Sequence, residues 1–532
     1  MTRPDHYDLV VLGAGFGGSL TAWIARSAGR RVLLLERGRH PRFAIGESST
    51  PLANLKLAAL ADRYHLTPLK PLCKYGPWKR SHPHIACGLK RGFSFFHHRS
   101  GRPFKPDTDH QNELLVAANP DAERGDTHWY RSDFDAFLVE QARTAGVTYV
   151  DRCDVIEIHR GPPWRLRVAT PTGPMDVTAG FLIDATGDSR RIADIVDAID
   201  RTDTMQTRTY GLYSHFCNVA PWSDVLAELG GSTDDHPYPC DAAALHHVID
   251  GGWMWVLRFD NGITSAGFSL NPRTHPPDAA GSPDEQWRSL MAVYPSIARQ
   301  FREATPVFPL IRTNRLQRRL DRTAGDDWAL LPHSAGFVDP WLSTGIAQTI
   351  DGIERLAPIL TGDCDPLHRD WALAAYDRNV NRSFDLIDRL VAACMRSFEC
   401  FDVMTSVTMA YFAAATFTEE RLRAGVDVSA HGFLLAQDDR FGEIADEMYR
   451  AVGNISRLDA AAFTKRVADL LTPYNTIGLC DPARRNMYPF TGSIEPADSP
   501  ASEPATQVAG RAKPRVDTAN GRASTAERSR RL

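Results

Sequence analysis

The sequence has few cysteines and no paired cysteine motif. Its nine cysteines are spread over 532 residues and never form a CxxC pair. Neither a cysteine-bound zinc site nor a disulfide framework is therefore indicated, and we expect no metal. An apolar stretch at 403–417 is shorter than the ~20 residues that a spanning helix needs. We interpret it as a buried or amphipathic core helix, with association at a membrane surface as the alternative.

An excess of charge of either sign is also lacking. The chain has 61 basic and 65 acidic residues, a formal net charge of -4, which gives no electrostatic reason to expect a nucleic-acid partner. Residues 1–7 are polar and lead directly into an apolar run, without the basic region and cleavage site of a secretory signal. We therefore expect a cytoplasmic protein with no membrane span.

The first recognisable pattern is a strand, helix and strand near the start of the chain. Residues 7–12 form a short apolar run that ends in glycines, 19–28 continue with helical spacing, and 31–35 are a second apolar run. This order predicts a β-α-β unit. Alternating runs between 209 and 270 predict an antiparallel sheet, and 3.6-residue periodicity from 343 to 471, including one long stretch at 383–410, predicts helices.

A dinucleotide fingerprint lies between the first strand and helix. Gly13, Gly15 and Gly18 occupy the three positions of a GxGxxG motif. They allow a tight turn, close approach of a pyrophosphate and close helix–strand packing, respectively, while the helix N-terminus supplies free N–H groups. Glu36 ends the second strand and could accept hydrogen bonds from a ribose diol. From this region we predict cofactor contacts at Gly13, Gly15, Phe16, Gly17, Gly18, Glu36 and Arg37.

Two later segments favour FAD over NAD. Residues 181–187 resemble the strand-end ATG motif of two-dinucleotide flavoproteins, which implies contacts from Asp184, Ala185, Thr186 and Gly187. Residues 335–340 resemble the segment that contacts the ribityl chain, but His333-Ser334 stands where that group usually has Gly-Asp. Asp339 could either replace the missing ribityl contact or serve the turn at Pro340.

Together these patterns predict an α/β protein with a Rossmann-like FAD-binding domain, an antiparallel-sheet substrate layer and a helical C-terminal region. We predict the FAD-binding core at 1–205 and 300–355, including the segment around Lys90, and the substrate-facing layer at 206–299. The helical region is expected at 356–492. Residues 493–532 are rich in Pro, Ser, Thr and Arg and are expected to form a disordered tail.

The sequence resembles the flavin-dependent halogenases over roughly residues 7–420. Four segments carry the resemblance: 13–18, 43–51, 184–187 and 339–345. In that family reduced FAD, oxygen and halide give hypohalous acid, which reaches a lysine beside an aromatic substrate. The fold is shared with FAD monooxygenases and geranylgeranyl reductase-like proteins, so it does not settle the reaction. A flavin-binding protein without turnover is a third hypothesis.

The resemblance assigns the catalytic residues Lys90, Trp253 and Trp255. Lys90 lies in a segment of lysine, small residues and aromatics, where desolvation would keep its amine reactive. A surface lysine at a strand end is the alternative, with Lys74 and Lys79 as fallback candidates. The two tryptophans match a WxWxIP segment, but Leu257-Arg258 replaces Ile-Pro, so they could also be core residues of one strand face.

The resemblance also implies a halide site and further flavin contacts. Chloride or bromide is expected at Ser343, Thr344 and Gly345, where a helix begins after a proline turn. Tryptophan halogenases have a glutamate directly after this segment, and this sequence has none directly after Gly345. A phenol or pyrrole substrate, either free or carrier-bound, is therefore favoured over tryptophan. A separate flavin reductase is expected, since the chain has no second GxGxxG motif. The remaining implied cofactor contacts are Arg42, Ile45, Gly46, Glu47, Ser48, Arg131, Asp339, Gly345 and Ile346.

Overall fold

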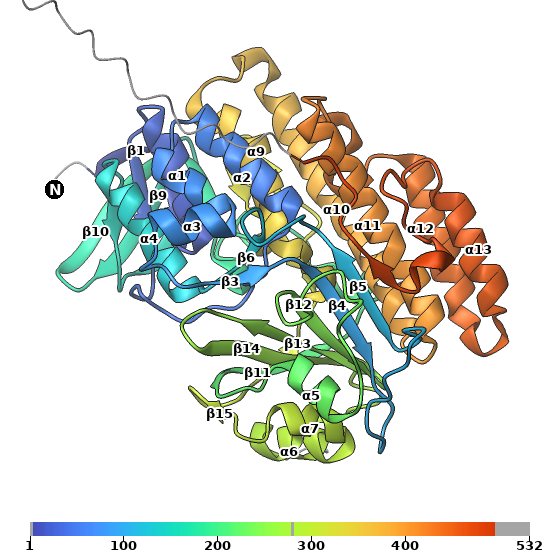
Figure 1. The fold of residues 1–532 in the computed structure, drawn as a ribbon. Coiled ribbons are helices and arrows are strands. Elements are labelled where there is room, and N and C mark those ends of the chain that lie inside the picture. Colours follow the sequence, from blue (N-terminus) through green and yellow to red (C-terminus); the bar gives the residue numbers. More distant parts are fainter. Residues whose placement is uncertain (1–3, 278–280, 495–532) are drawn as a thin grey trace, which may run out of the picture. The chain divides into compact units, whose positions relative to one another are not determined.

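The computed structural model describes residues 4–277 and 281–494. The described residues up to 493 form one compact unit. Nearly all of the tail expected at 493–532 lies outside the described residues. Two large sheets, two small two-stranded sheets and a group of C-terminal helices make up this unit (Figure 1). The helices that precede residue 340 are α1 (Phe16–Ser27), α2 (Pro51–Arg63), α3 (Tyr75–Ser81), α4 (Arg131–Thr144), α5 (Trp222–Glu228), α6 (Pro283–Val293), α7 (Pro295–Gln300) and α8 (Pro332–Ala335).

The first sheet contains the predicted β-α-β unit. Its central order is β18-β19-β10-β1-β2-β7, in which every pair is parallel except β18 with β19. Helix α1 contacts both α4 and the later helix α9 (Thr344–Thr361). The strands of this sheet are β1 (Asp5–Leu12), β2 (Val32–Leu35), β7 (Thr148–Val150), β8 (Asp154–His159), β9 (Trp164–Thr170), β10 (Gly173–Asp184), β18 (Ala324–Gly325) and β19 (Trp328–Leu330). The Rossmann-like prediction is confirmed.

The second sheet has the order β15-β11-β14-β13-β12-β4-β5-β21, with β16 beside β11. It is antiparallel except where β12 meets β4 and β21 meets β5. One cluster of buried side chains includes Phe96, Trp222, Met254, Phe268 and Trp287. The strands are β4 (Gly92–His97), β5 (Glu113–Ala117), β11 (Tyr210–Cys217), β12 (Ala244–Ile249), β13 (Gly252–Arg258), β14 (Ile263–Leu270), β15 (Thr305–Pro306), β16 (Ile311–Arg315) and β21 (Met487–Tyr488).

The placement of β4 and β5 differs from our expectation. We predicted residues 92–117 within the FAD-binding core, but β4 pairs with β12 of the second sheet. The aromatic side chains of β4 explain this placement, because the ring of Phe95 stacks on His246 at 4.5 Å and contacts Trp341 at 5.2 Å. Lys90 lies just before this sheet, in the two-stranded pair β3 (Cys87–Lys90) and β6 (Asp126–Trp129).

The C-terminal helices are α9 (Thr344–Thr361), α10 (Arg369–Arg396), α11 (Phe401–Arg423), α12 (Asp439–Ala451) and α13 (Ala460–Leu471). The stretch at 383–410 is helical as predicted except at 397–400, where the chain breaks between α10 and α11. There Ser397 bonds through its Oγ to the carbonyl oxygens of Ala393 and Cys394, a local contact that competes with helix continuation. The stretch at 403–417 is mostly buried in α11. No described helix is both long and apolar enough to cross a membrane.

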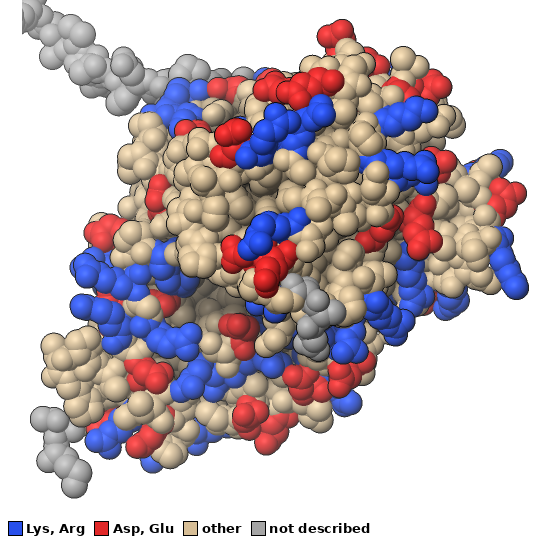
Figure 2. Space-filling model, turned by 90° about the horizontal axis from the view of Figure 1, so that it is seen from below, with Lys and Arg blue, Asp and Glu red and all other residues tan. Residues whose placement is uncertain are grey.

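Three further short elements lie near the start of α9. They are η5 (Trp341–Ser343), β17 (Arg318–Arg319) and β20 (Gly336–Phe337), and the two strands pair with each other. On the face drawn in Figure 2, acidic and basic side chains are interspersed, and lysine and arginine side chains border a hollow. That distribution agrees with the small net charge and gives this face no continuous basic surface of the kind that binds nucleic acid.

Candidate functional site

The glycine fingerprint forms the turn that its spacing predicts. Gly13 has a φ of +94°, and a Cβ there would lie 2.6 Å from the carbonyl oxygen of Ala185. A Cβ on Gly18 would lie only 2.0 Å from the carbonyl oxygen of Gly13. Gly15 is different, because its nearest neighbours are the guanidinium groups of Arg131 and Arg42 at 3.8 Å. Gly13 and Gly18 are thus required by the backbone, whereas Gly15 keeps space open.

A cavity of about 420 Å³ lies beside this turn. Four arginines line it, together with Gly15 at the N-cap of α1, and their guanidinium groups suit a pyrophosphate. The lining includes nine of the predicted cofactor residues: Gly13, Gly15, Glu36, Arg37, Arg42, Arg131, Ala185, Thr186 and Gly187. The other predicted cofactor residues are outside this lining: Phe16, Gly17, Gly18, Ile45, Gly46, Glu47, Ser48, Asp184, Asp339, Gly345 and Ile346.

Glu36 fastens the second strand to the glycine turn. Its two carboxylate oxygens accept hydrogen bonds from the backbone N–H groups of Ala14 (2.9 Å) and Gly38 (2.8 Å). Burial opposes ionisation, but the neighbouring Arg42 and these two amides outweigh it and lower the pKa of the Glu36 carboxyl. A charged carboxylate therefore faces the cavity at the place where a ribose diol would be bound.

The segment after β10 is fixed by Asp184 and Ser334. Buried Asp184 accepts hydrogen bonds from the backbone N–H and hydroxyl of Thr186 (2.9 and 2.7 Å). The Oγ of Ser334 accepts one from the N–H of Gly187 at 2.9 Å, so the departure from Gly-Asp has a structural role here. The neighbouring His333 lines the cavity, and burial lowers its pKa to about 4, which leaves the ring uncharged.

Arg131 joins the cavity to the segment expected to meet the flavin. It forms a bidentate ion pair with buried Asp135 at 2.7 and 2.8 Å. Its remaining nitrogen donates to the carbonyl oxygens of Ile45 and Gly46, both at 2.9 Å. Glu47 follows and bonds to His215 at 2.7 Å. This network fixes residues 45–47 beside Arg131, which itself lines the cavity.

Lys90 is completely buried, which excludes the surface-lysine alternative. Its Nζ donates to the Oγ of Ser48 at 2.9 Å and to the carbonyl oxygen of Ser49 at 2.7 Å, and lies 3.9 Å from the centre of the Phe93 ring. Of the residues that the structure describes, none places a carboxylate within ion-pair distance of this amine. Burial is the main cause that lowers the pKa of Lys90 to about 7. The fallback lysines, Lys74 and Lys79, are partly exposed.

A buried acidic residue near Lys90 was not predicted. Glu419 lies on α11, and burial raises the pKa of its carboxyl to about 8 despite the nearby Arg423. Together with Phe93 it lines a narrow cavity of about 30 Å³, whose other walls include Tyr411, Phe412 and Phe490. The signal in the sequence was an acidic residue two positions after the apolar stretch 403–417, but only the fold brings it close to Lys90.

The two predicted tryptophans lie on β13 and turn to the same side, with ring centres 5.9 Å apart. The indole N–H of Trp253 donates to Asp339 at 3.1 Å, and that of Trp255 donates to Ser265 at 3.2 Å. Arg258, which replaces the family proline, donates to the carbonyl oxygens of Val219 and Ala220. Both side chains are buried in the core, and Trp253 packs against Trp341 of η5.

Asp339 accepts four hydrogen bonds from protein donors. We therefore interpret it as a residue that positions the protein backbone, and not as a contact to the ribityl chain. Its donors are the hydroxyls of Thr209 (2.8 Å) and Ser269 (2.7 Å), the Trp253 indole and the N–H of Trp341 at 3.0 Å. Burial raises the pKa of this carboxyl to about 6, although all four donors oppose the rise. The carboxylate thereby ties the start of η5 to the second sheet.

We expect Asp339→Ala to destabilise the protein by about 3–5 kcal/mol, because it leaves four buried donors without an acceptor. Urea unfolding followed by tryptophan fluorescence measures this loss. The matched variant Ser269→Ala removes one donor and should cost about 1 kcal/mol. Equal stability of the two variants would show that the carboxylate does not hold this junction.

The predicted halide residues lie where α9 begins. Leu342 and Ser343 both have left-handed backbone conformations, with φ values of 68° and 56°. Such conformations are costly outside glycine and are retained where function constrains the backbone. They direct the chain into the N-terminus of an 18-residue helix at Thr344 and Gly345. A helix start of this kind offers free N–H groups to an anion.

Three comparisons relate the chain to known proteins. Residues 11–60 match a family model described as an NAD(P)-binding Rossmann-like domain. Monodechloroaminopyrrolnitrin halogenase PrnC from Pseudomonas fluorescens is 30% identical over 75% of this chain and 69% of its own length. Tetracycline 7-halogenase from Kitasatospora aureofaciens is 28% identical over 78% of this chain and 74% of its own length.

The solved structure of halogenase PltM has the same fold. It superposes with a TM-score of 0.80 at 23% identity, covering 90% of this chain and 99% of PltM. The chain belongs to the flavin-dependent halogenases, a family of FAD-dependent oxidoreductases.

Proposed function

We propose that this protein uses reduced FAD, oxygen and chloride or bromide to halogenate an electron-rich aromatic compound of phenol or pyrrole type in secondary metabolism. The observation that carries the proposal is Lys90, a fully buried amine bonded to Ser48 and free of any described ion-pair partner. A buried lysine of this kind costs stability, so its presence favours a chemical role. Relatives support the substrate class, since they include a tetracycline 7-halogenase and a brominase of a carrier-bound pyrrole.

The proposed cofactor site follows from the charges around the cavity. Arg42, Arg37 and the start of α1 would hold the pyrophosphate, and Glu36 would bind the adenosine ribose. Residues 45–48 and 343–346 would hold the flavin ring and the halide. When bound and reduced, the flavin supplies the electrons with which oxygen and halide give hypohalous acid. We propose a separate flavin reductase as the source of reduced FAD, because the sequence has one GxGxxG motif.

Lys90 would hold the electrophile in one place. Its neutral amine can hydrogen-bond hypohalous acid or take the halogen from it. In the second case an N–halogen bond forms as the halogen–oxygen bond breaks, and the amine proton leaves with the hydroxide as water. Transfer to an aromatic carbon then forms the carbon–halogen bond, and the ring proton restores the amine. Only an unprotonated lysine can act in this second way.

The cavity beside Phe93 is our proposed substrate site. A protonated Glu419 carboxyl could both donate and accept a hydrogen bond, which suits a phenol hydroxyl or a pyrrole N–H. Its volume of about 30 Å³ is room for about one water molecule. Admission of an aromatic ring therefore requires the surrounding side chains to move. A crystallised PltM complex contains phloroglucinol and FAD, which makes phloroglucinol a suitable first test substrate.

The rate of halogenation should rise with pH through about 7. Burial holds the pKa of Lys90 near that value, so the reactive neutral amine is the minor form below it and the major form above it. The measurement is single-turnover product formation between pH 6 and 9, with pre-reduced FAD so that the reductase does not contribute. A rate that falls across this range would point to the ammonium form instead.

A product assay tests the proposed function. Purified protein is mixed with FAD, a flavin reductase, NADH, oxygen and either chloride or bromide, and offered phenols and pyrroles, free and carrier-bound. Mass spectrometry should show the isotope pattern of the supplied halogen in the product. Hydroxylated products alone would contradict halogenation and favour the monooxygenase alternative. That alternative is tested because Leu257-Arg258 stands where the halogenase segment has Ile-Pro.

A further inference from the structure

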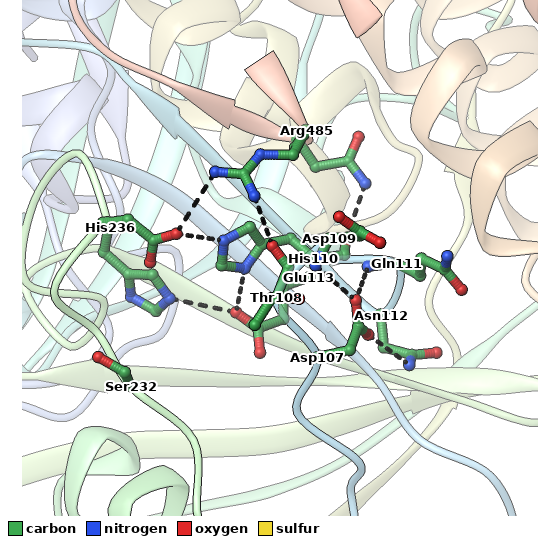
Figure 3. Close-up of polar contacts among 12 residues, drawn as sticks. Asp107, Thr108, Asp109, His110, Gln111, Asn112, Glu113, Ser232, His236 and Arg485 are labelled. Atoms are coloured by element: carbon green, nitrogen blue, oxygen red, sulfur yellow. Dashed lines mark hydrogen bonds and ion pairs between the residues drawn. The ribbon is translucent and has the colours of Figure 1, made fainter. Parts of the chain in front are cut away.

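A cluster of metal-ligating side chains lies at the edge of the second sheet, on segments not used by the proposed reaction. His110 precedes β5, Glu113 begins β5, and His236 lies in the loop between α5 and β12. One potential ligand atom from each lies within 4.8 Å of the others. Figure 3 shows both imidazole rings directed at the carboxylate of Glu113. We propose that these three residues form a site for one zinc ion or a similar divalent transition metal.

The spacing of the ligand atoms fits such an ion. The Oε2 of Glu113 lies 3.4 Å from the Nδ1 of His110 and 3.1 Å from the Nε2 of His236. Ligand atoms that bind zinc tetrahedrally at about 2.0–2.1 Å are separated from one another by about 3.3 Å. Two imidazoles and one carboxylate form a common zinc ligand set, and water can fill the fourth position. Small side-chain movements would complete the site.

A second feature, independent of the spacing, also indicates a metal. The Nε2 of His110 lies 2.8 Å from the carboxylate of Asp235, and Arg485 lies 3.9 Å from the same oxygen. Metal-bound histidines usually donate their other ring N–H to a carboxylate in this way, which fixes the tautomer and directs the remaining lone pair at the metal. Asp235 would be this outer partner.

A bound ion would also resolve a conflict between two hydrogen-bond acceptors, one on His110 and one on Glu113. If Nε2 of His110 donates to Asp235, then Nδ1 of a neutral ring presents a lone pair to the carboxylate oxygen of Glu113, and two acceptors face each other. Protonation of the ring removes this conflict, and so does a cation placed between the three ligand atoms. The cation also uses the lone pair of His236 and balances the charge of Glu113, which is buried at 3% exposure.

The site would join three distant parts of the chain. Arg485 donates to the carbonyl oxygen of Thr108 at 2.8 Å, and Asn486 donates to that of His110 at 3.0 Å. Immediately afterwards β21 pairs with β5. A bound ion would therefore hold the loop at 107–113, the loop at 232–236 and the C-terminal segment together, as structural zinc sites do.

Metal binding to the full-length protein tests the proposal. The protein is stripped with a chelator, dialysed and titrated with Zn²⁺ and, separately, with Co²⁺. We expect about one equivalent of either ion, a rise in Tm with Zn²⁺, and the visible absorption of four-coordinate Co²⁺. Glu113→Gln, which preserves the size of the side chain but removes its charge, and His236→Ala should each weaken binding by at least about 100-fold. Asp235→Asn should weaken it about 10–100-fold.

The control is the exposed pair of His159 and Glu157, whose side chains approach to 3.7 Å without burial. His159→Ala should leave metal stoichiometry and affinity unchanged. Two results would overturn the proposal: no binding to wild type at micromolar free Zn²⁺, or equal affinity of wild type and a folded Glu113→Gln. Far-UV circular dichroism of each variant shows whether it is folded, and the conservative Glu113→Gln makes the comparison independent of any misfolding of His236→Ala.

Discussion

Replacing Lys90 by methionine should reduce halogenation by a factor of about 10³ or more and, at the same time, stabilise the protein. Methionine fills a similar volume beside Phe93 but has no amine to hold a halogen, and loss of such a group costs on the order of 10²–10⁴ in rate. Oxidation of reduced FAD should continue, because Lys90 is outside the arginine-lined cavity. Product analysis and oxygen consumption, measured together, separate the two effects.

The gain in stability follows from the direction of the pKa shift. Burial lowers the pKa of Lys90 from 10.5 to about 7, so the folded state opposes the protonated form. This penalty is complete below pH 7, declines as the pH rises to 10.5, and is absent above it. Methionine removes the penalty but leaves the carbonyl oxygen of Ser49 without its donor. We expect a net gain on the order of 2 kcal/mol at pH 7 and little gain near pH 10.

Lys56 is the matched control, because it is also buried but has partners. Its Nζ lies 2.9 Å from Asp351 and 2.5 Å from Glu354. Burial opposes its charge, but these two carboxylates outweigh that effect and raise its pKa. Lys56→Met should therefore destabilise the protein, by about 3 kcal/mol. If Lys90→Met retained halogenation, or if both variants lost stability equally, Lys90 would not be the strained reactive amine of this account.

Alanine at Gly15 and at Gly18 should have opposite effects on folding and on FAD binding. Gly15 has a φ of -66°, which alanine adopts readily, and no protein atom lies closer than 3.8 Å to the added Cβ. The methyl group points into the space expected for the pyrophosphate, so Gly15→Ala should fold normally and bind FAD at least about 100-fold more weakly.

Gly18→Ala should instead fail to fold stably. Its Cβ would lie 2.0 Å from the carbonyl oxygen of Gly13, and neither backbone segment can move without disrupting the packing of α1 against β1. A loss of more than about 4 kcal/mol is expected. Thermal unfolding of the apoproteins and titration with FAD distinguish the variants. Wild-type stability of Gly18→Ala, or wild-type FAD affinity of Gly15→Ala, would contradict the assigned roles.

The sequence predicted the Rossmann-like part of the fold well, because that part depends on local pattern. The GxGxxG spacing specified both the turn and the helix that follows, and acidic Glu36 at the end of β2 was identifiable from its distance along the chain. The tryptophans of β13 could be placed on one face from the two-residue repeat of a strand. In each case a short segment contains all the information.

The surroundings of Lys90 and the histidine cluster depend on contacts between distant segments, which no local pattern encodes. Lys90 was assigned from a family resemblance, yet its burial results from β3, β6 and residues 48–49 meeting in space. Glu419 joins it from more than 300 positions away. His110 and His236 belong to different loops of one sheet, so the search for cysteine pairs could not reveal their cluster. The placement of β4 and β5 was missed because their pairing with β12 crosses about 150 residues.

The central claim is that halogen reaches the substrate by way of Lys90. A single-turnover experiment with pre-reduced FAD, chloride and phloroglucinol tests it most directly, by comparing chlorinated product formed per flavin oxidised in wild type and in Lys90→Met. The account predicts substantial chlorinated product in wild type and at least about 10³-fold less in the variant, although its flavin is fully oxidised. Chlorinated product at the wild-type ratio in Lys90→Met, or hydroxylated product alone in wild type, would contradict it.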